Sequence, residues 1–203
     1  DASTALTAWG AREECAARLV AHIADMGERF RLQGPHYPGF DVPWTTSAVC
    51  RMDGGIADNV VPEEAHFHYE FRNLPGADVG PMQDEVLQRA AGLEAAMKAI
   101  DPATGFRFDV LTEMPAFLAP PDDPAVRLTQ RLLGSEGTTL VAFGTEAGLF
   151  QRAGMATVVC GPGFIAQAHQ ADEYVSLAQM AACERFLASL RSPQACEMVQ
   201  AAA

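Results

Sequence analysis

The spacing of apolar residues changes along the chain, and each spacing predicts a type of element. Over 5–32 apolar residues recur every three to four positions, which predicts one long amphipathic helix. The ranges 45–52 and 65–73 alternate apolar and polar residues on either side of a Gly- and Asn-containing turn, which predicts two antiparallel strands. A second helix is predicted over 79–100 and a third strand over 106–112.

This order, α-β-β-α-β, corresponds to a ferredoxin-like βαββαβ unit without its first strand. Beyond the prolines of FLAPPDDP the pattern changes to alternating helices and strands, which predicts an α/β piece. Its helices are expected from about residue 124, over 146–152 and over 177–190, and its strands over 138–143 and 155–160. We therefore predict an α+β domain over 1–115 and an α/β portion over 116–203.

Composition narrows the classes of partner. The net charge is −12, with 14 basic against 26 acidic residues, so a nucleic-acid backbone would be repelled. No apolar run reaches the roughly 18 residues of a membrane helix, and the N-terminal residues lack a signal-peptide pattern. Five scattered cysteines without a CxxC pair argue against a disulfide framework and a thiolate zinc site. We expect a cytoplasmic protein that binds neither nucleic acid nor membrane.

Two segments of the second half carry candidate chemistry. His169 follows a predicted strand and a Gly-Pro-Gly loop, a position that suits a metal ligand but also an ordinary polar loop residue. One histidine cannot make a metal site. Gly144 suits a tight turn and Thr145 a helix N-cap, which would leave backbone N–H groups for a carboxylate, although an ordinary cap explains both residues equally well.

Two further candidates belong to the predicted strand pair. Asn59 lies in the turn and could present its amide to a substrate, although the turn glycines are explained by the turn alone. Arg72 ends a strand on the face opposite Phe67, Tyr69 and Phe71, where it could hold a carboxylate bidentately or form a surface salt bridge. The histidines 66 and 68 share this polar face. They could bind zinc, but a solvated sheet face explains them better.

Taken together, the motifs carry a resemblance that none carries alone. TTSAVCRMDGGIADNVVPEEAHFHYEFRNLPG and FGTEAGLFQRAGMATVVCGPGFIAQAHQADEYV occur in order at 45–76 and 143–175. They resemble the acetylornithine deacetylase branch of the dinuclear-zinc aminoacylase and carboxypeptidase superfamily. In that family a ferredoxin-like lid domain, which mediates dimerisation, is inserted in a catalytic domain that binds two zinc ions.

The resemblance implies roles for individual residues. It makes His169 the final zinc ligand, Arg72 the lid arginine that holds the substrate carboxylate, and Asn59 the lid asparagine that reaches the substrate. Gly144 and Thr145 correspond to a loop lining the substrate pocket, and Glu146 to a variable position in substrate selection. The implied reaction is hydrolysis of an N-acyl amino acid, most like N-acetylornithine in arginine biosynthesis.

The chain also departs from the family pattern. The other zinc ligands and the catalytic glutamate of the family lie upstream of the lid, and we find none of them here. We expect the lid histidine that completes the partner's active site, and the first lid strand, to precede Asp1 as well. The chain alone is therefore expected to be inactive without a missing N-terminal catalytic segment. We expect a homodimer through the lid, using the polar side of 65–73 and the long first helix. The alternative function is a non-catalytic dimerisation or amino-acid-binding module.

Overall fold

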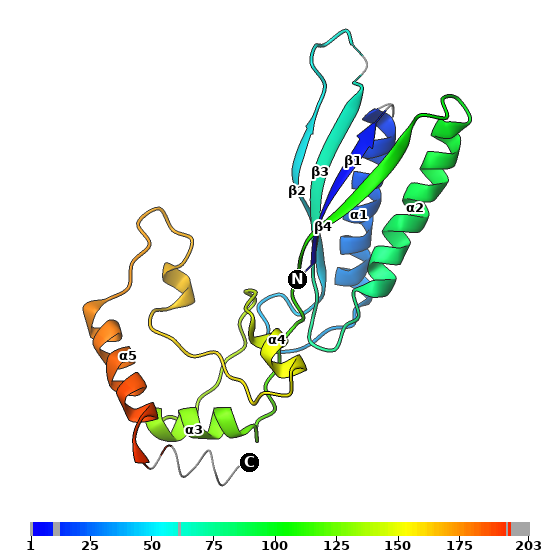
Figure 1. Ribbon diagram of the computed structural model, residues 1–203. Helices are drawn as coiled ribbons and strands as arrows, with labels where there is room; N and C mark the ends of the chain where they lie inside the picture. Colours follow the sequence, from blue (N-terminus) through cyan, green and yellow to red (C-terminus); the bar gives the residue numbers. More distant parts are fainter. Residues whose placement is uncertain (1, 10–12, 61, 194, 196–203) are drawn as a thin grey trace. The chain divides into compact units, whose positions relative to one another are not determined.

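The computed structural model describes residues 2–9, 13–60, 62–193 and 195 (Figure 1). The chain divides into two compact units. The first comprises Asp1–Ala116 with Leu140–Thr145, and the second comprises Phe117–Thr139 with Glu146–Ala203.

The first unit is built on one four-stranded antiparallel sheet. Its strands are β1 (Ala2–Trp9), β2 (Thr46–Gly54), β3 (Glu64–Arg72) and β4 (Gly105–Glu113), in the spatial order β2-β3-β1-β4. The helix α1 (Glu13–Gln33) connects β1 to β2, and α2 (Gly80–Lys98) connects β3 to β4. This is the complete ferredoxin-like βαββαβ topology.

The expectation that the first strand lies upstream of the chain is therefore wrong. Residues 2–9 form β1, which pairs with β3 on one side and with β4 on the other. The predicted helix over 5–32 correspondingly starts later, at Glu13. Leu6 lies opposite Phe67 of β3 and Phe108 of β4, which places it in the sheet interior. Its apolar neighbours happen to continue the helical spacing of α1, so periodicity alone assigned β1 to the helix.

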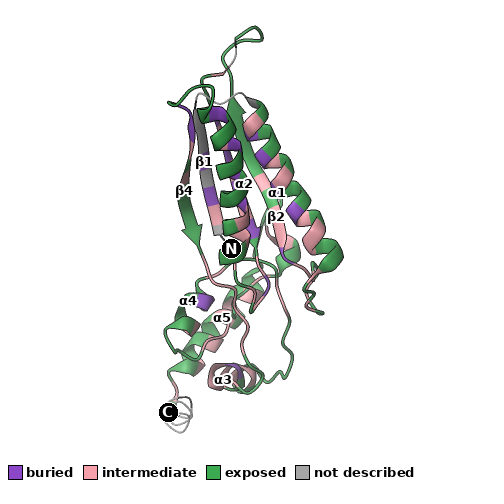
Figure 2. Cartoon of the chain, turned by 90° about the vertical axis from the view of Figure 1, so that its right-hand side faces the viewer, coloured by how far each residue is buried: buried purple, intermediate pink, exposed green. Residues whose placement is uncertain are grey.

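Both helices pack on the same face of the sheet and enclose the core (Figures 1 and 2). The alternation of β3 sends Phe67, Tyr69 and Phe71 into this core, where all three are almost fully buried. Leu19, Ile23 and Met26 meet them from α1, and Val86, Ala90, Leu93 and Met97 meet them from α2. The opposite face of the sheet carries mostly polar side chains, with Leu111 of β4 among them.

The open edges of the sheet are β2 and β4, because each of them has one paired neighbour. β3 lies inside the sheet between β2 and β1. A lid contact through the polar side of 65–73 can therefore use the side chains of β3 but not its backbone groups, which are already paired. α1 packs beneath β2, so the β2 edge and α1 lie beside each other.

The second unit contains short helices joined by long irregular segments. These are α3 (Pro124–Leu133), α4 (Ala147–Arg152), a 3₁₀ turn η1 (Ile165–Gln167) and α5 (Leu177–Leu190). The strands predicted over 138–143 and 155–160 are not found among the described residues. The described part of the second unit contains no sheet, so the α/β character predicted for 116–203 is not seen. A run of apolar residues predicts a strand, but a strand forms only where another strand hydrogen-bonds to its backbone N–H and C=O groups.

The second unit buries little apolar surface. Its buried hydrophobic residues among those described are Val126, Ala147 and Ala195. Large apolar side chains remain exposed on most of its segments: Leu133, Leu149, Phe150, Met155, Val159, Phe164, Ile165, Tyr174, Val175, Leu177, Met180, Leu187 and Leu190. An exposed apolar surface of this extent is larger than the scattered apolar residues on the surface of most folded domains.

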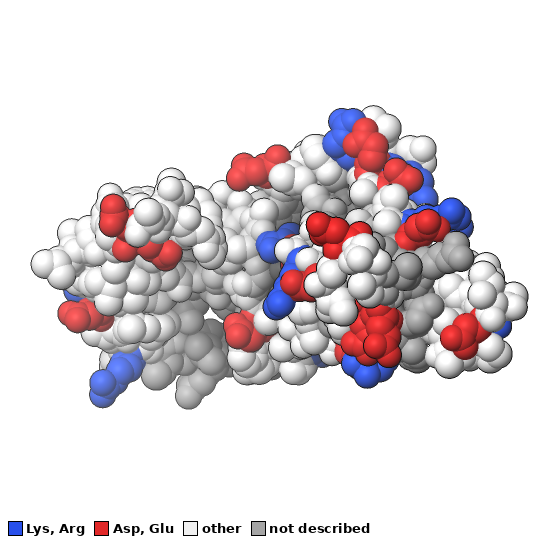
Figure 3. Space-filling view, turned by 90° about the horizontal axis from the view of Figure 1, so that it is seen from above, with Lys and Arg blue, Asp and Glu red and all other residues white. Residues whose placement is uncertain are grey.

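None of the helices in the described ranges combines the length and apolar composition that crossing a membrane requires. Charged side chains are mixed over the face shown in Figure 3, where blue and red groups lie beside one another. The ion pairs of the first unit include Arg29–Glu85, Arg31–Glu28 and Arg51–Asp53.

Candidate functional site

Arg72 ends β3 on the polar face of the sheet, as the alternation of the strand predicts. Its Nε donates a hydrogen bond of 2.7 Å to Oε1 of Glu70, two residues earlier on the same face. The Arg72 side chain is 50% exposed and that of Glu70 22% exposed. The guanidinium is thus fixed at one side while remaining accessible to a ligand carboxylate.

Asn59 lies in the loop that joins β2 to β3, at the opposite end of this hairpin from Arg72. The loop begins at Gly55, whose φ of 81° favours glycine, and residues 55–60 are all exposed. β3 separates the two positions by eight residue steps, or roughly 26 Å at the rise of an extended strand. Within one chain the structure therefore does not bring Asn59 and Arg72 to the same small molecule.

Gly144 and Thr145 belong to the first unit, whereas Glu146 belongs to the second. Glu146, and not Thr145 as predicted, is the N-cap of α4, and its side chain makes no capping hydrogen bond. Its carbonyl oxygen accepts the N–H groups of Leu149 and Phe150 at 2.9 and 3.2 Å. This segment is thus an ordinary start of a six-residue helix, and it supports a substrate role only through its position in the sequence motif.

His169 follows η1 in the second unit and is exposed. Its φ is 57°, a left-handed conformation that is uncommon outside glycine. The backbone N–H of His169 donates to Oε2 of Glu173 at 3.0 Å, which ties the loop down and leaves the imidazole to other partners. A single residue held in this region is often found at binding sites.

The donor set around His169 does not complete a metal centre. Among the described residues, no group of three or more His, Cys, Asp or Glu side chains gathers where a metal ion could be held. His169 can provide one imidazole ligand, but a zinc site requires three or four protein ligands. The residues described here thus do not fit a dinuclear zinc site by themselves.

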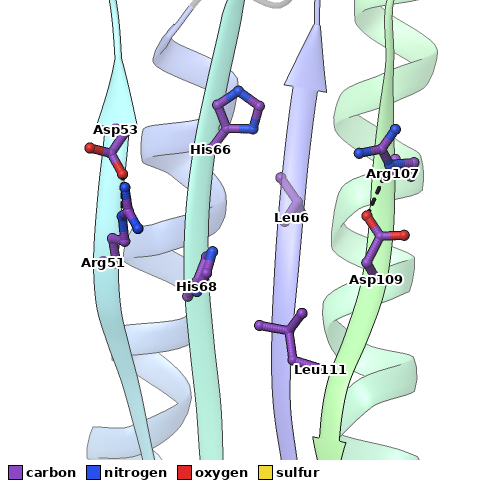
Figure 4. A pocket seen from close by; sticks show the side chains of 8 residues that line it. All are labelled: Leu6, Arg51, Asp53, His66, His68, Arg107, Asp109 and Leu111. Atoms are coloured by element: carbon purple, nitrogen blue, oxygen red, sulfur yellow. Dashed lines mark hydrogen bonds and ion pairs between the residues drawn. The ribbon is translucent and has the colours of Figure 1, made fainter.

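The polar face of the sheet also forms an open hollow (Figure 4). Two in-strand ion pairs flank it, Arg51–Asp53 on β2 and Arg107–Asp109 on β4, with Nε–Oδ2 distances of 2.6 and 2.9 Å. His66 and His68 of β3 lie between them. The charges are paired along each strand, as is usual on a solvated sheet face. This arrangement agrees with the sequence-based interpretation of His66 and His68 as residues of a solvated face.

Sequence reasoning did not single out Glu70 or Cys50, which surround Arg72. The pKa of the Cys50 thiol is raised, mainly because the thiol is partly desolvated. The Glu70 carboxylate raises this pKa further, whereas the Arg72 guanidinium lowers it. The bulge in the β2–β3 ladder between Val49 and Arg51 falls at Cys50. The sequence signal for Glu70 was its i,i+2 spacing from Arg72, but His68 and His66 share the same face, so spacing alone could not select it.

A comparison with protein families matches residues 13–96 to the peptidase dimerisation domain of the M20 group. The match covers α1, β2, β3 and most of α2. The four-stranded antiparallel sheet with its helices agrees with this domain. The expectation of a dimerisation domain is thereby confirmed.

Curated relatives extend the similarity over most of the chain. The acetylornithine deacetylase of Yersinia pseudotuberculosis is 30% identical over 168 residues, which are 81% of this chain and 40% of the relative. That of Myxococcus xanthus is 33% identical over 150 residues, or 74% of this chain and 38% of the relative. The chain thus spans about 40% of the length of these relatives.

Solved structures share the fold at low sequence identity. A tripeptidase from Staphylococcus aureus has a TM-score of 0.61 and 16% identity, covering 92% of this chain and 50% of its own. A dinuclear metal-binding peptidase of the M20 family from Bacillus subtilis has a TM-score of 0.54 and 11% identity, covering 93% of this chain and 48% of its own. These likenesses support the fold.

Proposed function

We propose that this chain is part of a zinc-dependent amidohydrolase. The premise is that it carries an M20 peptidase dimerisation domain and is a distant homologue of the acetylornithine deacetylases. Residues 1–115 would be its lid and 116–203 the C-terminal portion of its catalytic domain. The substrate would be an N-acyl amino acid, with N-acetylornithine the first candidate. The reaction would release the free amine and a carboxylic acid in the cytoplasm, in arginine biosynthesis.

The observation that carries this proposal is the placement of Asn59 and Arg72 at opposite ends of one hairpin. A substrate of amino-acid size cannot contact both residues of one protomer across roughly 26 Å of strand. In a dimer of lids, one end of the hairpin can serve its own active site while the other serves that of its partner. A dimerisation domain with a substrate-binding residue at each end of one hairpin suits this arrangement.

The residues of this chain would bind and orient the substrate. The Arg72 guanidinium would hold the α-carboxylate of the amino acid, and the Asn59 amide would donate to the acyl carbonyl or accept from the amide N–H. His169 would supply one ligand to the metal centre. The remaining ligands and the general base would come from a catalytic segment outside this chain, and zinc held by that complete set would supply Lewis-acid chemistry for hydrolysis.

The apolar surface of the second unit supports a missing partner segment. Exposed side chains such as Phe150, Phe164 and Leu177 are of the kind that a larger catalytic domain buries. The homodimer would form through the lid at the β2 edge together with α1, since β2 is an open edge and α1 lies beside it. These contacts leave the polar face of the sheet accessible.

The test is hydrolysis of N-acetyl-L-ornithine by the complete protein that contains this segment, with zinc removed and restored. Activity should require zinc, and the 203-residue chain alone should be inactive. Arg72→Ala should lower kcat/KM by about 100-fold, mainly through KM, because it removes a bidentate carboxylate contact. His169→Ala should instead lose bound zinc and lower kcat by about 1,000-fold.

Metal analysis separates the two roles. Equal zinc loss in both variants would contradict the assignment of Arg72 to substrate and His169 to metal. Turnover by the rigorously purified chain alone would contradict its dependence on another segment. A well-folded dimer of the complete protein without hydrolytic activity would favour the alternative, a non-catalytic dimerisation or amino-acid-binding module.

A further inference from the structure

We infer that Glu70 is a positioning residue for Arg72, which fixes the guanidinium through Nε and leaves its two terminal nitrogens directed at a substrate carboxylate. The inference rests on the proposed function, because it gives Arg72 a carboxylate ligand. It adds a residue that acts through Arg72 and does not itself touch the substrate. The geometry of the ion pairs in this chain carries it.

The Arg72–Glu70 pair is a one-point contact. Nε of Arg72 lies 2.7 Å from Oε1 of Glu70, and Arg72 makes no other side-chain hydrogen bond within the described residues. The helix arginines differ: Arg29 donates two hydrogen bonds to Glu85, at 3.0 and 2.6 Å, and Arg31 donates two to Glu28, at 2.7 and 2.5 Å. Their guanidinium groups are already occupied by carboxylates of the chain. That of Arg72 keeps both terminal nitrogens, which are the pair that grips a carboxylate in parallel.

The strands around Glu70 explain why this contact can be kept. Glu70 stands on the inner strand β3, with Ala48 of β2 opposite it on one side and Ser3 of β1 on the other. These small neighbours leave room for the carboxylate against the sheet. Glu70 is less exposed than Arg72, 22% against 50%. The anchor is therefore the more sheltered member of the pair and the ligand-binding group the more accessible one.

Glu70 could in principle compete with a substrate for Arg72. A competitor would have to occupy the terminal nitrogens, as Glu85 does with Arg29. Since Glu70 occupies Nε, an incoming carboxylate can bind without breaking the ion pair. Because Glu70 holds the arginine in place before binding, less side-chain entropy is lost when the carboxylate binds. Glu70 should thus increase affinity for the carboxylate.

The experiment measures hydrolysis by the complete protein of two substrates that differ by one carboxylate, N-acetyl-L-ornithine and N-acetylputrescine. Glu70→Ala should raise KM for N-acetyl-L-ornithine by about tenfold with kcat nearly unchanged. It should leave kcat/KM for N-acetylputrescine within about twofold, because that substrate lacks the carboxylate. Glu70→Gln should restore most of the affinity, since its amide oxygen still accepts the Nε–H.

Two controls separate positioning from a general effect of charge on the sheet. Asp53→Ala and Asp109→Ala remove the acid from the other two one-point pairs of this face, and they should leave both substrates unaffected. In an Arg72→Ala background, Glu70→Ala should have no further effect, because its role passes through Arg72. An unchanged or lowered KM in Glu70→Ala, or a full effect that persists without Arg72, would overturn the inference.

If the complete protein hydrolyses no N-acyl amino acid, the proposed function fails, and the positioning contact is then decided in this chain itself. In nitrogen-15 NMR spectra the Nε–H of Arg72 should exchange with water about tenfold more slowly in the wild type than in Glu70→Ala. Asp53→Ala should leave that rate unchanged. Equal rates in the wild type and Glu70→Ala would show that Glu70 does not hold the guanidinium.

Discussion

At the scale of single residues, Tyr69 joins the sheet to the helix α2. Its ring lies in the core between those of Phe67 and Phe71, with centroids 6.1 and 5.8 Å away. Its hydroxyl donates to Oε1 of Gln83 at 2.9 Å. Burial raises the pKa of the Tyr69 phenol above its ordinary value of 10.0, although hydrogen bonds with Gln83 and Thr4 act in the opposite direction.

This shift predicts how stability depends on alkaline pH. The folded state holds the phenol proton more tightly than the unfolded state, so the contribution is complete below pH 10 and is lost as the pH rises through the raised pKa. Tyr69→Phe should therefore reduce the alkaline loss, while costing about 1 kcal/mol at pH 7 for the missing hydrogen bond. Urea unfolding at pH 7 and above pH 10 measures both. Tyr174→Phe, at an exposed position, should match the wild type at pH 7, and an unchanged alkaline slope in Tyr69→Phe would contradict the prediction.

The site residues differ in how well their surroundings could be predicted. Arg72 lies on the polar face because Phe67, Tyr69 and Phe71 occupy the other, and simple alternation predicts this. Its ion pair with Glu70 could not be selected, because several polar residues share the face. For His169 the sequence predicts the loop but neither the left-handed φ nor the hydrogen bond from its backbone N–H to Glu173.

At the scale of elements, β1 is the strand on which the sheet of the first unit depends. It lies between β3 and β4, so both sides of its backbone are paired. Leu6 is 1% exposed, in contact with the core beneath the sheet. Without β1, β3 and β4 would no longer belong to one sheet.

A pair of leucine substitutions tests the placement of β1. Leu6→Ala should lower the free energy of unfolding by about 2–5 kcal/mol, because it leaves a cavity in the core. Leu111→Ala, on β4 but 52% exposed, should change it by less than about 0.5 kcal/mol. Urea unfolding followed by circular dichroism measures both. If Leu6→Ala were as mild as Leu111→Ala, residues 2–9 would not form an inner strand.

The elements that the sequence predicts well have a complete periodic signal of their own. The alternation of β3 and the apolar stripe of α1 after residue 13 are long enough to define both strand and helix. The prediction of β1 fails because the apolar residues of this strand continue the spacing of the helix that follows it. The predicted strands over 138–143 and 155–160 fail for another reason, since strand formation needs a partner that no local pattern contains.

At the scale of the whole molecule, the dimerisation domain carries Asn59 and Arg72 at the two ends of one hairpin. If both residues bind substrate, a dimer must combine the Asn59 of one protomer with the Arg72 of the other in each active site. The peptidase dimerisation domain over 13–96 supports such an assembly. The arrangement can be tested without a structure of the dimer, because it fixes how defective subunits complement each other.

At a substrate concentration well below KM, mixing Asn59→Ala and Arg72→Ala subunits of the complete protein should restore activity far above the low activity of either variant alone. In a mixed dimer, one active site receives both substitutions and the other receives none. Random exchange of subunits should recover about a quarter of the wild-type rate, since half of the dimers are mixed and each has one intact site. Sedimentation confirms that dimers form, and mixing Arg72→Ala with Arg72→Lys serves as the control that should not complement. If dimers that have exchanged subunits recover no activity, Asn59 and Arg72 do not act in active sites shared between protomers. They would then have to act in the same protomer's site, which the length of β3 does not allow for one substrate. The paired substrate-binding roles of Asn59 and Arg72 would have to be abandoned.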